Sequence, residues 1–93
     1  GSVKFFDAKA LIQSNGDTCH LSDTQNKIMS NLVCFQDGID KKLLYKKIWP
    51  KDKNISDNKL DTHLTNLRNL IFDFCNYFLN FKSTKGNIKL DIS

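Results

Sequence analysis

The residue types that most often carry chemistry are few and scattered in this sequence. The three cysteines include no CxxC pair, and Cys19-His20 has no second pair at the spacing that a zinc site needs. The two histidines have no nucleophile at convincing spacing, and the four glycines form no phosphate-binding loop. We therefore expect no enzyme activity and no metal or cofactor site. Cys34 and Cys75 stand among apolar neighbours, which predicts buried free thiols in a reducing cytosol.

The basic residues indicate a binding function instead. The chain has a formal charge of +4, and its 14 basic residues are 13 lysines and the single arginine, Arg68. Six of the lysines fall within KKLLYKKIWPKDK, residues 41–53. Such clustering suggests an electrostatic partner, most often nucleic acid, although a solvated helix face would show the same pattern.

Length and composition predict one folded domain. The chain has 93 residues, of which 40% are hydrophobic, enough for one small core. Gly1 and Ser2 are interpreted as a remnant of cloning, and residues 3–93 as a domain cut from a longer protein. No apolar run approaches the roughly 18 residues that span a membrane, so we expect no membrane contact from this domain.

The first part of the chain predicts a sheet followed by a helix. Residues 3–21 contain short apolar runs around SNGD, whose Asn-Gly pair favours a tight hairpin turn. Ser22 and Gln25 then form a capping box, which marks the start of a helix. Ile28, Met29, Leu32 and Val33 are the predicted inward face of this helix, and Asp37-Gly38 its end.

Two further helices and a hairpin are predicted after it. Asp40 is a suitable N-cap for a short helix that Pro50 stops, with Leu43, Leu44 and Ile48 facing inward. Residues 50–56 form a loop. A longer helix is expected over residues 57–78, capped by Ser56 or Asp57. Its apolar stripe has helical spacing and consists of Leu60, Leu64, Leu67, Ile71, Phe74, Cys75 and Phe78. NFK and NIKLDI predict two strands around STKG.

This order of elements describes an α+β winged helix-turn-helix, with an N-terminal antiparallel sheet, three helices and a C-terminal hairpin wing. In this architecture the long helix would enter the major groove of DNA, and the basic hairpin would reach the adjacent minor groove or the phosphates.

The stretch from Leu21 to Leu70 resembles the C-terminal effector domain of OmpR/PhoB-type response regulators. LSDTQNKIMSNL is similar to the family's first helix, and IDKKLLYKKIW to the segment that ends in a tryptophan, here Trp49. SDNKLDTHLTNLR follows the pattern D-x-x-V-D-x-H-I-x-x-L-R, whereas KSTKGNIKL resembles the wing without its usual tyrosine. The resemblance implies an N-terminal sheet of four strands. It also implies a preceding receiver domain, phosphorylated on Asp, which is absent here.

The resemblance further implies a function in transcription. It suggests the sequence-specific DNA-binding domain of a cytoplasmic regulator in a bacterial two-component phosphorelay. Implied partners are promoter DNA with direct-repeat half-sites, a second copy on that DNA, and RNA polymerase at loop 50–56. Carried over by position, the DNA-binding candidates are Trp49, Asn58, Lys59, Thr62, Thr65, Asn66, Arg68, Lys82 and Lys85.

The sequence also departs from the family on the helix that would read DNA. Thr65 and Asn66 stand where arginines are common, although Asn66 could bond an adenine edge and Thr62 could pack on a thymine methyl. We expect Asp61 to orient Arg68 or another base-reading side chain, and His63 to be an ordinary, partly buried histidine. The lost arginines leave an alternative open, a winged-helix module for protein contacts with weak DNA affinity.

Overall fold

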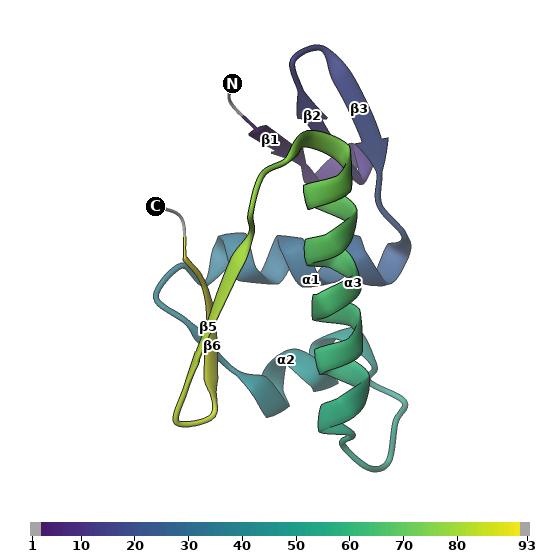
Figure 1. Cartoon of the computed structure of the whole chain (residues 1–93). Helices are drawn as coiled ribbons and strands as arrows, with labels where there is room; N and C mark the ends of the chain where they lie inside the picture. Colours follow the sequence, from purple (N-terminus) through teal and green to yellow (C-terminus); the bar gives the residue numbers. More distant parts are fainter. Residues whose placement is uncertain (1–2, 92–93) are drawn as a thin grey trace.

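The computed structural model describes residues 3–91, with a long central helix, a small sheet near one end of it and a hairpin along its side (Figure 1). The first sheet is antiparallel and contains β1 (Val3–Phe6), β2 (Leu11–Ser14) and β3 (Asp17–His20) in that order. Both residues of the predicted Asn15-Gly16 turn have positive φ, 53° and 85°. Three strands form this sheet in the described residues, instead of the four that the resemblance implied. The 3-10 turn η1 (Asp7–Lys9), which links β1 to β2, was not predicted.

The first helix, α1 (Asp23–Cys34), starts at the predicted capping box. The Ser22 hydroxyl accepts from the Gln25 amide, and the Gln25 side chain accepts from the Ser22 amide. Ile28, Met29 and Leu32 are buried, but Val33 is 38% exposed, so its predicted inward position is wrong. Leu32 faces the core, and Val33 is the next residue round the helix. The Val33 side chain therefore points beyond the edge of the core.

The second helix, α2 (Lys41–Ile48), has the predicted N-cap, since the Asp40 carboxylate accepts from the Leu43 amide at 3.1 Å. Its buried face is Leu44, Tyr45 and Ile48, whereas Leu43 is 48% exposed. The prediction that Leu43 faces inward is therefore wrong. Positions 44, 45 and 48 form a stripe at helical spacing, and position 43 lies outside that stripe.

The third helix, α3 (Asp57–Cys75), is the long central element in Figure 1. Ser56 is its N-cap, with the Lys59 amide donating to the Ser56 hydroxyl at 3.4 Å. The predicted stripe is confirmed where Leu60, Leu64, Leu67 and Ile71 are buried. The helix ends three residues before the predicted boundary, because Asn76 adopts the left-handed conformation that closes its last turn. Phe78, which was predicted in the stripe, lies beyond the helix and is 65% exposed.

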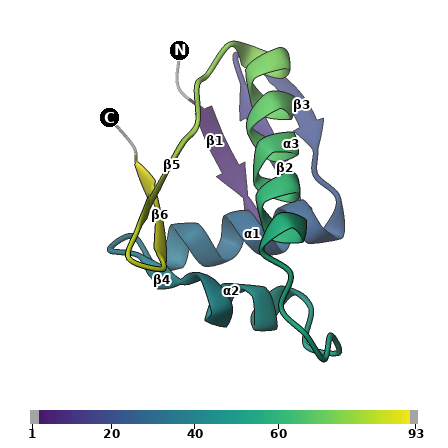
Figure 2. The same cartoon turned by 60° about the horizontal axis from the view of Figure 1, so that its bottom comes forward.

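The wing is the predicted hairpin of β5 (Asn80–Thr84) and β6 (Asn87–Asp91). Its turn, Lys85-Gly86, has positive φ at both residues. A two-residue strand, β4 (Ile39–Asp40), also pairs with β6, which gives the sheet order β4-β6-β5. This pairing was not predicted. It ties the wing to the start of α2, as Figure 2 shows.

The cysteines are less buried than predicted. All three are free, and Cys34 is exposed because it ends α1, while Cys19 and Cys75 are partly buried. The prediction of a buried Cys34 is therefore wrong. Burial, and secondarily the nearby Cys75, raises the pKa of the Cys19 thiol.

Candidate nucleic-acid interface

Between Asn58 and Asn69, the side of α3 that faces away from the core carries mainly uncharged polar side chains, with the exposed Asp61 at its edge. At about 100° per residue, this surface is opposite the buried leucines. Its members are all exposed, and we call them the outward face: Asn58, Thr62, Thr65, Asn66 and Asn69. The first four line one shallow hollow together with Asp61. Four of the DNA-binding candidates are thus contiguous in space.

On one flank of the outward face, α3 packs against the end of α2. The Lys59 ammonium lies 4.4 Å from the centre of the Trp49 ring, a distance at which a cation interacts favourably with an indole face. The partly buried His63 ring packs against Trp49 in a tilted arrangement, with the ring centres 5.2 Å apart, as expected for an ordinary packed histidine. Trp49 is half-buried against both helices, so its ring has a packing role whether or not it also approaches a phosphate.

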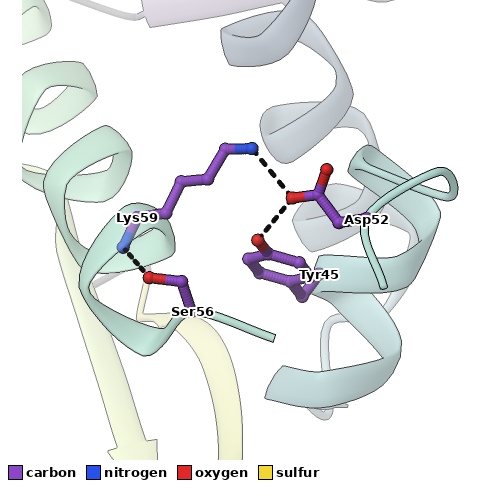
Figure 3. A network of polar contacts seen from close by, with 4 residues as sticks. All are labelled: Tyr45, Asp52, Ser56 and Lys59. Atoms are coloured by element: carbon purple, nitrogen blue, oxygen red, sulfur yellow. Dashed lines mark hydrogen bonds and ion pairs between the residues drawn. The ribbon is translucent and has the colours of Figure 1, made fainter. Parts of the chain in front are cut away.

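The same lysine belongs to a polar network that the sequence did not predict (Figure 3). The Tyr45 hydroxyl donates to Asp52 Oδ2 at 2.6 Å, and Lys59 Nζ donates to the same oxygen at 2.9 Å. These contacts join α2, the loop of residues 50–56 and the first turn of α3. We call Tyr45, Asp52 and Lys59 the loop clasp.

The contacts of the loop clasp shift the pKa values of Asp52 and Tyr45. The Tyr45 hydroxyl, followed by Lys59, lowers the pKa of Asp52 from its usual 3.8. The Asp52 carboxylate, followed by burial, raises the pKa of Tyr45 above its usual 10.0. At neutral pH Asp52 is therefore a charged carboxylate and Tyr45 a neutral phenol. One signal in the sequence could have pointed to this network, because Tyr45 occupies a position in the buried helical stripe of Leu44 and Ile48.

The other flank of the outward face meets the wing. Asp61 Oδ1 lies 3.5 Å from Lys41 Nζ, so the partner that the structure gives this carboxylate comes from α2 and is not Arg68. Arg68 is partly buried, with its guanidinium carbon 6.0 Å from the centre of the Phe78 ring. A hollow between α3 and the wing is lined by Lys41, Asp61, Leu64, Thr65, Arg68, Phe81, Ser83 and Ile88.

The wing carries exposed lysines beside this hollow. Lys82 Nζ lies 3.5 Å from Asp91 Oδ2, on the neighbouring strand. Lys85 is at the exposed turn of the hairpin and takes part in no ion pair within residues 3–91. Lys89 is exposed on β6. Lys82 and Lys85, the two predicted wing residues, are therefore accessible, and of these two only Lys82 is paired with a carboxylate within residues 3–91.

The arrangement of a helix pair, a long third helix and a paired hairpin defines a winged helix-turn-helix domain. Within residues 3–91, no helix has the combination of length and apolar character that crossing a bilayer requires. The same part of the chain gathers no group of three or more His, Cys, Asp or Glu side chains that could hold a metal ion.

The chain is similar to the solved C-terminal domain of the nisin resistance regulator NsrR, described as a lantibiotic response regulator. The two share 26% sequence identity and superpose with a TM-score of 0.70, over 97% of this chain and 91% of that one. No family model and no curated protein matches the chain. The structural similarity confirms the predicted resemblance to response-regulator effector domains, and it agrees with the prediction that the domain is not an enzyme.

Proposed function

We propose that this domain binds double-stranded DNA in a sequence-specific manner, as the output domain of a bacterial two-component transcription regulator. In this proposal α3 enters the major groove and the wing contacts the adjacent minor groove or the phosphates. The observation that carries it is the exposed polar face of α3 with the basic wing packed alongside.

The dimensions of α3 suit this role. Its 19 residues extend over about 28 Å, and an α-helix fits a major groove about 12 Å wide. The five residues of the outward face are uncharged, and the carboxylate beside them, Asp61, lies 3.5 Å from the Lys41 ammonium, which offsets its charge near the phosphates. Exposed lysines on α2 and the wing supply the positive charge that attracts the DNA backbone.

The direct test is DNA binding by the 93-residue chain, followed by fluorescence anisotropy of a labelled duplex. We expect binding that weakens steeply with salt, that favours some sequences over others, and that is impaired in Asn66→Ala. The matched control is Asn54→Ala, an exposed asparagine of the loop outside the outward face. Absence of binding to any duplex at low salt would refute the proposal.

The loop of residues 50–56 is the proposed contact with RNA polymerase. The loop clasp holds it against α2 and α3, while Ile55 is 36% exposed and available to a partner. If the proposal holds, Ile55→Ala lowers transcription from a target promoter in a purified system and leaves DNA affinity unchanged. A variant that transcribes normally would remove this contact from the proposal.

Protein recognition is the second candidate function, and one observation favours it. Phe72 and Phe78 form an edge-to-face pair at 6.4 Å and are 45% and 65% exposed. Exposed aromatic side chains of this kind are enriched at protein interfaces. If this were the main function, Phe72→Ser would abolish capture of a partner while the domain showed little DNA affinity at low salt.

A further inference from the structure

The outward face of α3 has a chemical composition that favours one class of DNA sequence. Each base pair shows its own pattern of hydrogen-bond groups in the major groove. Guanine is read best by arginine or lysine, and cytosine by a carboxylate, whereas adenine is read by asparagine or glutamine and the thymine methyl by small apolar groups such as that of threonine. The outward face consists of three asparagines and two threonines.

The residues of α3 that could read G·C pairs are engaged elsewhere in the molecule. Between Asn58 and Asn69, the charged side chains are Lys59, Asp61 and Arg68. Lys59 is held by Asp52 at 2.9 Å and covers the Trp49 ring. Each contact directs the lysine toward α2 and away from the outward face.

Of the other two charges, Asp61 is directed toward the start of α2 and Arg68 toward the wing. Asp61 pairs with Lys41 at 3.5 Å, which offsets its negative charge within the protein. Arg68 is partly buried over the Phe78 ring and lines the hollow against β5. Asp61 still lines the hollow of the outward face with its side chain 56% exposed, but Lys41 offsets its charge, so amides and hydroxyls are the main groups presented to a groove.

We propose that α3 selects A·T-rich DNA, with asparagines on adenine edges and threonine methyl groups on thymine methyls. The inference rests on the proposed function and specifies the sequence class of its target. The outward face from Asn58 to Asn69 covers about 16 Å of helix, comparable with about five base-pair steps. A run of about four or five A·T pairs is therefore expected in each half-site.

The test is selection of bound sequences from a duplex library with a randomised centre, at low salt. We expect enrichment of an A·T run by wild-type protein and by the Asn54→Ala control. A G·C-rich consensus would overturn the inference while leaving the proposed function intact, whereas binding without base preference would overturn both the inference and the sequence specificity of the proposed function. Failure to bind any duplex would instead refute the proposed function, and the inference with it.

Two variants assign the contacts. Asn66→Arg should change one selected position from adenine to guanine, because arginine bonds both guanine acceptors, with a preference of about 5- to 150-fold. Thr62→Ser removes a methyl group, so replacing one thymine by deoxyuridine should weaken the wild-type complex and leave the variant unaffected. An unchanged selection by Asn66→Arg, or equal sensitivity of both proteins to deoxyuridine, would contradict these assignments.

Discussion

The salt dependence of DNA binding distinguishes the lysines that are free from those that the fold engages. Lys59 and Lys85 were both candidates for DNA contact. Lys85 is at the exposed wing turn with no carboxylate partner in the described chain, whereas Lys59 lies 2.9 Å from Asp52 and 4.4 Å from the Trp49 ring centre. For Lys59 to bind a phosphate, it would have to leave both contacts.

The magnitude follows from counterion release. Each phosphate contact on B-DNA contributes about 0.9 to the slope of log K against log salt. Lys85→Gln should therefore flatten the slope by about 0.9. Between about 50 and 200 mM salt, the affinity of the wild type should fall about 3.5-fold more than that of the variant. Lys59→Gln should change the slope by clearly less, and Asp52→Asn, which frees the Lys59 ammonium, should steepen it.

The assay is a salt titration of duplex binding by fluorescence anisotropy, with circular dichroism to confirm that each variant is folded. Lys4→Gln is the charge-matched control, since Lys4 is exposed on β1 of the N-terminal sheet and outside the proposed interface. Equal flattening by Lys59→Gln and Lys85→Gln would refute the argument that the loop clasp withholds Lys59. Equal flattening by Lys4→Gln would show that net charge alone sets the slope.

Three further predictions concern stability and reactivity. Because the folded pKa of Asp52 is lowered, its contribution to stability is present above the usual value of 3.8 and is lost as the pH falls through the folded pKa. Thermal melts should therefore show Asp52→Asn below the wild type at pH 7, with the difference narrowing in acid; a constant difference would contradict the pKa shift. With a chromogenic thiol reagent, Cys34 should react first and give a fast phase, since Cys19 is partly buried with a raised pKa. Cys34→Ser should remove this fast phase of the reaction. A fast phase that persists in the variant would place the accessible thiol elsewhere. Leu67→Ala should lower the free energy of unfolding by about 2–5 kcal/mol in urea denaturation, because Leu67 is 0% exposed. Leu43 is 48% exposed, so Leu43→Ala should change the free energy of unfolding by no more than about 0.5 kcal/mol. Similar losses at both positions would contradict the burial assigned to them.

Local signals predicted most of the secondary structure. The capping box at Ser22, the N-cap at Asp40 and the cap at Ser56 each involve hydrogen bonds within three residues, so the sequence around them is sufficient. The Asn15-Gly16 turn is local in the same sense. Two of the errors lie at the edges of the buried faces, where Val33 and Leu43 show that an apolar residue beside a stripe need not belong to it.

The candidate interface depended more on long-range contacts. The sequence by itself placed Asn58, Thr62 and Asn66 on one side of a helix, because helical geometry relates residues four apart. The state of the charges around them was decided by tertiary structure. Lys59 meets Asp52 from the loop and Asp61 meets Lys41 from α2, and such pairs form only when separate elements pack together.

The position of the wing was also a tertiary result. Its strands and turn were predictable from alternating apolar residues and glycine, but its pairing with Ile39 and Asp40 joins residues about 48 apart in the chain. No local pattern encodes such a partner, since a two-residue strand has too little sequence to be recognised. The sequence by itself therefore determined the main helices and strands and most of the side chains that they expose. The packing of those elements decided which exposed charges remain free to meet a ligand.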